Sequence, residues 1–206
     1  KHLVRRVERA SVSVELGREV TAEAIRAATP DAAIIATGPK DVIPAIPGLE
    51  EAAPVLAADV LSGLAKTGHR VAIIGGELVG CETAEYLAER GKIVTVLRRG
   101  PEMATSVSPS LKAFFLERLV RKGVRLMPGI TYREARPGYL MVDTAEGTTV
   151  AVEADTIVLA AGSTRDTTLA DALGGSVPEV CVVGDCAEPR GIIDAVSEGQ
   201  AAGLSI

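Results

Sequence analysis

A glycine turn is the feature of this sequence that most directly suggests chemistry. The stretch VAIIGGELVGCETAEYLAER, Val71 to Arg90, has the pattern of a buried strand that runs through a turn into a helix. Such a turn places backbone N–H groups and the positive end of a helix dipole against a pyrophosphate. Gly75, Gly76 and Gly80 would allow the tight turn and the close packing of helix on strand. The stretch predicts a dinucleotide site, with a purely structural strand, turn and helix as the alternative.

Glu77 stands at the middle glycine position of the G-x-G-x-x-G pattern. The glycine expected there lets the backbone approach the phosphates, so a carboxylate at this position predicts weakened nucleotide binding. Glu82 lies in the first turns of the following helix, where the helix dipole favours an anion by roughly 0.3–1 kcal/mol. The dipole alone would account for Glu82.

Two arginines stand where a ribose-reading residue is expected. A second strand, Ile93–Leu97, ends roughly 20 residues after the glycines, and Arg98 and Arg99 follow it. An acidic side chain would accept a hydrogen bond from the ribose 2′-hydroxyl, whereas an arginine would pair with a 2′-phosphate. The arginines therefore favour NADPH over NADH, and a solvated basic loop is the alternative.

The composition excludes several classes of function. The net charge is −5 and the chain has three tyrosines, two phenylalanines and no tryptophan, so nucleic acid is not an expected partner. His2 and His69 are expected at the surface, and they give no His-based triad or metal cluster. Cys81, Cys181 and Cys186 lack a C-x-x-C spacing and are expected to be reduced packing residues.

The sequence gives no membrane signal. Its longest apolar runs, such as Ile157–Ala161, are far too short to cross a bilayer, and no basic and apolar leader opens it. We therefore expect a cytoplasmic protein that does not bind a membrane. The first residue is Lys1 rather than methionine, so we interpret the chain as a piece of a longer protein.

Strands and helices alternate in the middle of the chain. This alternation predicts a parallel sheet covered on both faces. The stretch YLMVDTAEGTTVAVEA breaks the alternation with a β-hairpin that turns near Glu146 and Gly147. Ser108 and Pro109 form an N-cap and first-turn pair. The expected elements are helices at 59–64, 78–90 and 110–123, and strands at 71–74, 93–97 and 124–129.

One structural pattern occurs twice. DAAIIATG (31–38) and EADTIVLAAG (153–162) share an acidic residue, an apolar run, small residues and a final glycine. Two similar nucleotide-binding units in one chain are typical of enzymes that hold two dinucleotides. GPKDVIPAIPGLEEAAPV (38–55) lies between them, and its prolines predict a linker that crosses between domains.

Further elements are expected towards the ends of the chain. VSVEL (12–16) alternates like a half-buried strand, and TAEAIRAA (21–28) suits a short helix. VPEVCVVGDCAEPRGIIDAVSEGQAAG (177–203) has the pattern of an apolar strand that is closed by Gly184 and Asp185 and followed by an amphipathic helix. An aspartate at the end of such a strand is well placed to accept hydrogen bonds from sugar hydroxyls.

Four of these motifs, in this order, resemble the two-dinucleotide-binding flavoprotein reductases: IIATGPKDVIPAIPG, VAIIGGELVGCETAEYLAERG, VLAAGS and VCVVGDCAEPRGIIDA. More closely, GCETAEYLAERGK and GDCAEPRGIIDA with AGLSI are similar to the C-terminal half of bacterial 2,4-dienoyl-CoA reductases, in the NADH:flavin oxidoreductase and trimethylamine dehydrogenase group. The resemblance implies an α/β fold: a Rossmann-like three-layer nucleotide-binding domain with a β-hairpin excursion, plus partial FAD-domain segments.

The resemblance also implies what the rest of the protein contains. In this family an N-terminal barrel of the old-yellow-enzyme type carries FMN and an iron-sulfur cluster, and the C-terminal half binds FAD and NAD(P)H. Neither the barrel nor the first glycine fingerprint of the FAD domain is in this sequence. We therefore expect partial FAD-binding segments at 1–54 and 171–206 and an NAD(P)H-binding domain at 55–170. The expected partners are these dinucleotides, the parent chain's barrel and a second copy of the chain, because an incomplete FAD domain would leave apolar surface uncovered.

Matching motifs assign residues to the FAD site. By this resemblance Ala36, Thr37 and Gly38 would close over FAD. Asp185 would hold the ribityl chain, and Gly184 would allow a close approach. The helix of the C-terminal segment would point its first N–H groups at the flavin and help the reduced flavin hold its charge.

Other matching residues belong to the NAD(P)H site. Glu82 matches a glutamate that lies near the nicotinamide in related reductases, and Gly162 matches the glycine that ends the last strand of the domain. Glu77 departs from the family's glycine.

Two functions follow as hypotheses. In the first, the chain is an enzyme module, inactive alone, in which NADPH gives a hydride to FAD and electrons pass through the cluster and FMN to an unsaturated substrate. In the second, it is a non-catalytic nucleotide-binding or scaffolding domain, a hypothesis that rests mainly on Glu77.

Overall fold

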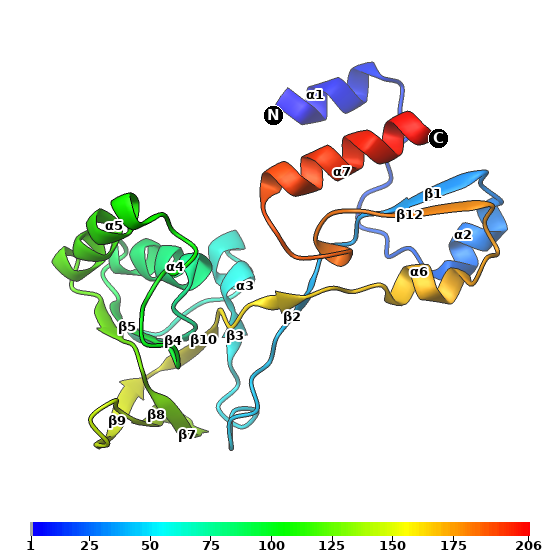
Figure 1. The fold of residues 1–206 in the computed structure, drawn as a ribbon. Helices are drawn as coiled ribbons and strands as arrows, with labels where there is room; N and C mark the ends of the chain where they lie inside the picture. The colour runs from blue at the N-terminus through cyan, green and yellow to red at the C-terminus, as the bar shows by residue number, and fades with distance from the viewer. Residues whose placement is uncertain (1) are drawn as a thin grey trace. The chain divides into compact units, whose positions relative to one another are not determined.

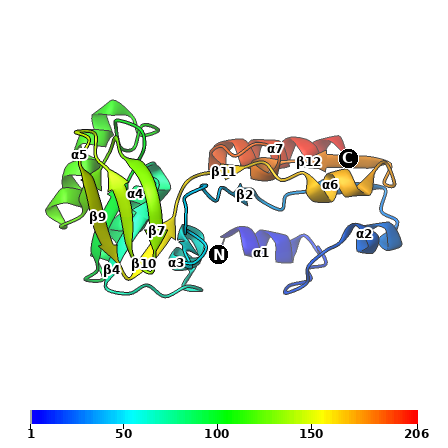
Figure 2. The same cartoon turned by 90° about the horizontal axis from the view of Figure 1, so that it is seen from below.

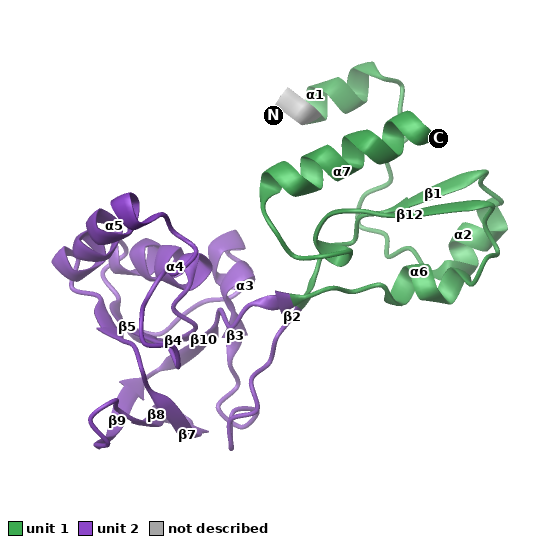
Figure 3. Ribbon diagram, viewed as in Figure 1, with its two compact units in different colours: residues 1–40, 164–206 green, residues 41–163 purple. Residues whose placement is uncertain are grey.

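The structure is a computed structural model that describes residues 2–206 and the side chains of residues 4–206. The chain divides into two compact units, which are coloured separately in Figure 3. Unit 1 is formed by the two terminal parts, up to residue 40 and from residue 164, and unit 2 by residues 41–163. The side chain of His2 lies outside the described residues, and His69 is exposed as expected.

The chain passes between the units twice. The two passages are the short strands β2 (Lys40–Asp41) and β11 (Ser163–Thr164), which pair with each other (Figure 2). The proline-rich segment 38–55, predicted to be a linker, contains β2 and otherwise consists of turns and irregular backbone up to β3. The backbone N–H of Val42 donates to the carbonyl of Gly162 at 3.0 Å.

Unit 2 is built on a parallel sheet of five strands. Its strand order is β3 (Val55–Leu56), β10 (Thr156–Leu159), β4 (Arg70–Ile74), β5 (Ile93–Leu97) and β6 (Arg125–Met127). Each neighbouring pair is parallel. The order reverses direction at β4, because the strands that follow β4 directly lie on one side of it and β10 lies on the other. Crevices at such switch points are where open α/β sheets bind their ligands.

Helices cover one face of this sheet (Figure 1). They are α3 (Ala57–Ser62), α4 (Leu78–Ala88) and α5 (Pro109–Arg121). Their buried side chains, such as Cys81 and Leu119, form one apolar cluster with alternate residues of β4 and β5. Leu119 and the cluster residues of β4 and β5 are at most 1% exposed. The parallel sheet predicted from the alternating pattern is confirmed, and with it the α/β fold.

A second, antiparallel sheet covers the other face. It contains β7 (Thr131–Arg136), β8 (Gly138–Asp143) and β9 (Thr149–Ala154). Leu140 and other inward side chains of this sheet share an apolar cluster with Ile74 and its neighbours in the parallel sheet. The predicted hairpin is the β8–β9 pair, and β7 adds a third strand that the pattern did not indicate. The predicted three-layer arrangement is therefore helix, parallel sheet, antiparallel sheet.

Unit 1 contains a parallel pair of strands, β1 (Ala32–Ile35) and β12 (Glu179–Val182). Two helices, α2 (Ala22–Ala28) and α6 (Thr168–Leu173), pack on one face of the pair in a small apolar cluster. The helix α7 (Ile192–Ser205) lies on the opposite face (Figure 1). Both strands, α2 and α7 were expected, but α6 was not.

The start of the chain differs from its prediction. A helix, α1 (His2–Arg9), precedes the segment VSVEL (12–16), which is irregular rather than a strand. The side chains of Val12, Val14 and Leu16 are exposed. An alternating segment becomes a strand only where another strand pairs with it, and none of the described strands pairs with residues 12–16. The strand predicted at 12–16 was therefore wrong.

Candidate functional site

The turn between β4 and α4 requires two of its glycines. Gly75 has φ +119°, and a Cβ built on it would lie 2.0 Å from the carbonyl oxygen of Ala160, which follows β10. A Cβ on Gly80, in the first turn of α4, would lie 1.9 Å from the carbonyl oxygen of Gly75. These contacts bring the N-terminus of α4 against the carboxyl ends of β4 and β10. The turn therefore lies at the switch point of the sheet.

Gly76 is required for a different reason: the side chains of Met103 and Arg98 occupy the space that its own side chain would fill. A Cβ on Gly76 would lie 2.3 Å from the sulfur of Met103 and 3.0 Å from the Cβ of Arg98. The carbonyl of Gly76 also accepts the backbone N–H of Ala104 at 2.7 Å. The loop that follows β5 is thus held directly against the glycine turn.

Glu77 is the N-cap residue of α4, but its side chain makes no capping hydrogen bond. Instead the carboxylate reaches the loop that follows β5. One oxygen, Oε1, pairs with the guanidinium of Arg98 and accepts from the hydroxyl of Thr105. The other, Oε2, accepts from the backbone N–H of Ser106 at 3.1 Å and lies 3.2 Å from its hydroxyl. The carboxylate therefore has four polar partners, although its side chain is 42% exposed.

These partners change the protonation of Glu77. Partial burial pushes the pKa of the carboxyl up, but hydrogen bonds from Thr105 and Ser106 and the charge of Arg98 outweigh burial and lower the pKa below 4.5. Glu77 is therefore an anion at neutral pH. Its charge adds to the effect of burial on the neighbouring Cys81, and the pKa of that thiol rises to about 11. Cys81 is accordingly a neutral packing residue, buried beneath the turn.

Arg98 lies at the end of β5 and is held in place by the backbone around it. Its side chain is 19% exposed and passes Gly76 and Gly100, where added Cβ atoms would lie 3.0 Å or less from it. Nη2 pairs with Glu77 and donates to the hydroxyl of Thr105 at 3.2 Å. Nη1 is buried and has no hydrogen-bond partner among the described residues. A buried N–H group without an acceptor costs about 1–3 kcal/mol and is typical of a site that a ligand or water completes.

The other residues predicted for this site lie apart from the Glu77 cluster. Arg99 is exposed, and so is Glu82 on α4. Gly162 follows β10 with φ +97°, and space around it is open. The structure thus brings together Glu77 and Arg98 with the turn that holds them, whereas among the described residues no side-chain hydrogen bond or ion pair joins Arg99 or Glu82 to that cluster.

The sequence did not single out Thr105 and Ser106. They stand in a polar loop without a motif, and their importance comes from the backbone hydrogen bond between Ala104 and Gly76, which brings the loop to the turn. The only available signal was a pair of hydroxyl residues shortly after the arginines.

Unit 1 holds the residues predicted for a flavin. Gly184, with φ +70°, follows β12 closely and donates its N–H to a carboxylate oxygen of Glu198 on α7 at 2.7 Å. The carboxylate of Asp185 is partly buried and accepts the backbone N–H of Arg190 at 3.3 Å. The guanidinium of Arg190 pairs with Glu198. Together these bonds fix the loop between β12 and α7.

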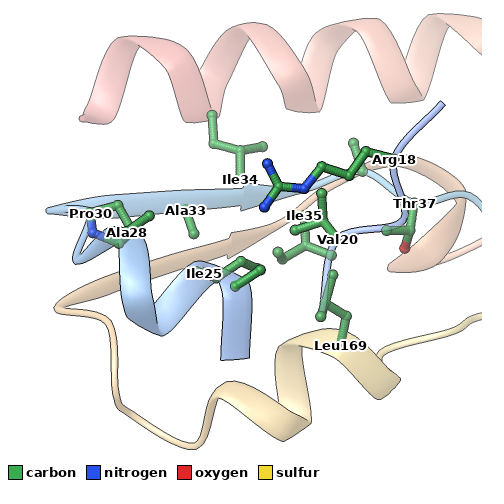
Figure 4. Close-up of a pocket in the computed structure, with 12 residues that line it drawn as sticks. Arg18, Val20, Ile25, Ala28, Pro30, Ala33, Ile34, Ile35, Thr37 and Leu169 are labelled. Atoms are coloured by element: carbon green, nitrogen blue, oxygen red, sulfur yellow. The ribbon is translucent and has the colours of Figure 1, made fainter. Parts of the chain in front are cut away.

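A cavity of about 400 Å³ lies in unit 1 along β1. Ala36 and Thr37, which follow β1, line it, and Gly38 comes next with φ +85°. Figure 4 shows Arg18 and, on the side of α2 and α6, Ile25 and Leu169 around the same space. Apart from Arg18 and Thr37 the lining residues are apolar. A mostly apolar cavity with a few polar groups is the usual form of a small-molecule site.

Neither a metal site nor a membrane span is found in the described residues. Over the part of the chain that the structure describes, no three His, Cys, Asp or Glu residues gather as a metal site. Within the same residues, no helix is both long and apolar enough to span a membrane. All three cysteines are free.

Comparison with known proteins identifies the family. The family described as pyridine nucleotide-disulphide oxidoreductase matches residues 2–203. The chain belongs to this family. The predicted NAD(P)H-dependent flavoprotein oxidoreductase module is thereby confirmed at the level of the family, as is the general binding of FAD and NAD(P).

Individual relatives in this family are reductases and oxidases. An NADH oxidase of Thermoanaerobacter brockii is 35% identical over 94% of this chain and 30% of its own length. A bilirubin reductase of Mediterraneibacter gnavus is 34% identical over 98% of this chain and 32% of its own length. The chain thus spans about a third of the length of these curated relatives.

A solved structure is similar over nearly the whole chain. A 2-naphthoyl-CoA reductase in complex with 2-naphthoyl-CoA is 34% identical and superimposes with a TM-score of 0.93, over 98% of this chain and 31% of that one. A histamine dehydrogenase from a Rhizobium species superimposes with a TM-score of 0.76 over 90% of this chain and 30% of its own, but at 19% identity it indicates the fold alone.

Proposed function

We propose that this chain binds NADPH in unit 2 and contributes part of an FAD site in unit 1, as a module of a larger flavoprotein reductase. One observation carries the proposal. The glycine turn lies at the switch point of a parallel sheet, and Arg98 lies beside it at the end of the next strand. The donors around Glu77 suit an anionic group, so the residues present fit a phosphate-bearing cofactor.

The domain division follows from this proposal. We assign residues 55–170 to the NAD(P)H-binding domain and residues 1–54 and 171–206 to FAD-binding segments. The separation into units supports it, since the terminal parts of the chain form unit 1 together. In unit 2, Gly75, Gly76 and Gly80 would shape the phosphate turn.

Roles for the remaining residues rest on the motifs. Bound NADPH would supply a hydride and bound FAD would accept it. In this proposal Glu82 faces the nicotinamide. Gly162, whose φ is positive, allows the backbone to turn away from the site after β10. Arg99 adds positive charge at the ribose.

In unit 1, we propose that Ala36, Thr37 and Gly38 bound the FAD site and that Asp185 accepts hydrogen bonds from the ribityl chain next to Gly184. The cavity that Ala36 and Thr37 line supports this assignment. The first N–H groups of α7 would stabilise negative charge on a reduced flavin.

For the whole protein, we propose a dienoyl-CoA-reductase-like enzyme. Its remaining part would be a barrel that carries FMN and an iron-sulfur cluster, and its substrate an unsaturated compound. The similarity to a structure named as a 2-naphthoyl-CoA reductase supports a substrate of this class. We place the protein in the cytoplasm, since it carries free thiols.

A second function is favoured by one specific contact. The carboxylate of Glu77 already fills the donors that a cofactor phosphate would use. A nucleotide-binding or scaffolding domain that no longer passes hydride would tolerate such a residue. Measured affinity separates the two functions.

The test is a calorimetric titration of the chain with NADP⁺ and with NAD⁺. We expect NADP⁺ to bind more tightly, since a charge-assisted hydrogen bond from Arg98 to a 2′-phosphate is worth about 1.5–3 kcal/mol, or roughly ten- to a hundredfold in affinity. Arg98→Glu should reverse the order. Binding of neither nucleotide would overturn the enzyme hypothesis for this chain, and equal affinities in both proteins would remove Arg98 as the reader.

A further inference from the structure

Glu77 occupies an anion site built by other parts of unit 2. Its carboxylate meets the guanidinium of Arg98, the hydroxyl of Thr105, and the N–H and hydroxyl of Ser106. These groups belong to Arg98, directly after β5, and to the loop that follows it in the sequence. Glu77 belongs to the glycine turn. Such a set of donors also suits a phosphate group, which carries more negative charge and more acceptor oxygens than the carboxylate that occupies it here.

Some of the contacts that position these donors do not involve the Glu77 side chain. Arg98 is confined between Gly76 and Gly100, and the loop is tied to Gly76 through the backbone of Ala104. Nη1 of Arg98 is buried without an acceptor among the described residues, so pairing with Glu77 leaves the guanidinium incompletely bonded. By contrast, the Glu77 side chain is 42% exposed and makes no capping hydrogen bond in its own helix, so only the contacts to Arg98, Thr105 and Ser106 hold it.

We propose that Arg98, Thr105 and Ser106 form a 2′-phosphate subsite that Glu77 fills as an internal anion, so that Glu77 determines how strongly the domain prefers a phosphorylated dinucleotide. The inference rests on the proposed function, because it requires that unit 2 binds a dinucleotide. A 2′-phosphate displaces the carboxylate and takes its donors. NAD⁺ has no group for these donors and leaves the pair of Glu77 and Arg98 intact.

The position of the donors selects the 2′-phosphate rather than the pyrophosphate. Pyrophosphate binds at the N–H groups of the glycine turn and the first turn of the helix. Thr105 and Ser106 belong to neither, and Arg98 stands at the ribose end of the site. Removing the Glu77 charge should therefore help NADP⁺ far more than NAD⁺.

The experiment compares dissociation constants for NADP⁺ and NAD⁺ by calorimetry in the 206-residue chain. Glu77→Gln keeps the shape and removes the charge, and Glu77→Gly is a second variant that removes the whole side chain. Glu89→Gln is the matched control, since it removes the same charge from the far end of α4, where Glu89 pairs with Lys122. Arg98→Gln and the double variant Glu77→Gln with Arg98→Gln complete a cycle.

We expect Glu77→Gln to raise the ratio of NADP⁺ to NAD⁺ affinity about tenfold or more, because one charge-assisted hydrogen bond to the phosphate is released from competition. Glu77→Gly should raise the ratio to a similar extent, in addition to any gain that both nucleotides share from a more open turn. Glu89→Gln should leave the ratio unchanged, and Glu77→Gln should have little effect once Arg98 is glutamine. Equal gains for both nucleotides in Glu77→Gln would indicate that the Glu77 charge acts on the pyrophosphate, and would overturn the inference.

Other outcomes distinguish a failure of the subsite from a failure of the proposed function. If both nucleotides bind and the ratio does not move, the 2′-phosphate subsite is wrong while the proposed function stands. The subsite is equally wrong if the ratio moves by the same factor in the Arg98→Gln background or in Glu89→Gln. If no protein of the series binds either nucleotide, the proposed function falls and the subsite falls with it.

Discussion

At the scale of single residues, Glu77 replaces the glycine of the turn with a carboxylate that binds neighbouring side chains. The glycine expected at this position would leave the phosphates open access to the backbone, whereas the carboxylate binds Arg98 and the loop behind it. This arrangement stabilises the ligand-free domain, and under the proposed function the carboxylate would compete with a phosphate for the same donors. Because the side chain is 42% exposed, solvent screens the pair, and its contribution to stability is expected to be at most about 1 kcal/mol.

The lowered pKa of Glu77 gives this contribution a pH dependence. A carboxyl whose pKa is lower in the folded protein stabilises the fold above its unfolded pKa, near 4.5, and loses that effect as pH falls through the folded pKa. Glu77→Gln should therefore reduce the free energy of unfolding by up to about 1 kcal/mol at neutral pH, and the difference should disappear in acid. Urea unfolding at several pH values measures it. A difference that stays constant into acid would show that shape, not charge, is responsible.

At the scale of elements, the packing of α4 on the turn depends on Gly80, where a side chain would meet backbone. A Cβ at Gly80 would collide with the carbonyl oxygen of Gly75, whereas a Cβ at Gly199, inside α7, would meet nothing within 4 Å. In a helix interior alanine is more stable than glycine by about 1 kcal/mol, which applies in full to Gly199 and at most in part to Gly80 in the first turn of α4. At Gly80, however, the collision opposes that gain, and overpacking typically costs about 1–3 kcal/mol.

The matched pair of substitutions tests this difference. Gly80→Ala should speed amide hydrogen exchange in α4, and Gly199→Ala should slow it in α7. Exchange followed by mass spectrometry reports each helix separately, so the two units need not unfold together. Unchanged or slower exchange of α4 in Gly80→Ala would contradict the close contact.

Elements with a strong local pattern were predictable, and those that depend on distant partners were not. The strand at 93–97 was predicted at its observed bounds, since apolar residues and flanking turns define it locally. VSVEL has a good strand pattern but no described strand to pair with. The glycines and Arg98 were located by their spacing. The hydrogen-bond donors to Glu77, Thr105 and Ser106, could not be located from the sequence. They lie in a loop without a recognisable motif, and only the fold brings that loop to the turn.

At the scale of the whole molecule, the two units differ in how completely they are covered. The parallel sheet of unit 2 is covered on both faces, by helices and by an antiparallel sheet. Within its described residues, unit 1 is built on one pair of strands, β1 and β12, and a small apolar cluster. Parallel sheets are normally buried on both faces, and most sheets contain more strands. Unit 1 is therefore where we expect the chain to require further contacts.

The exposed face of α7 is where we expect such contacts to form. Ile192 and Ile193 are each 84% exposed and Leu204 is 79% exposed, and Val196 lies one turn from the isoleucines. Apolar side chains grouped in this way usually mark an interaction surface. We expect the chain alone to associate with itself through α7, as proposed from the resemblance of its terminal segments to an FAD domain.

Sedimentation velocity over a range of concentrations measures this association. Replacing Ile192 and Ile193 with lysine should shift the chain towards the monomer, because two charges would have to be buried in the contact. Leu64→Lys is the control, since Leu64 is 81% exposed but belongs to unit 2. It should leave the distribution unchanged. A chain that sediments as a monomer at every concentration would contradict self-association. If Leu64→Lys had the same effect as the lysine substitutions at Ile192 and Ile193, α7 would not be the surface through which the chain associates.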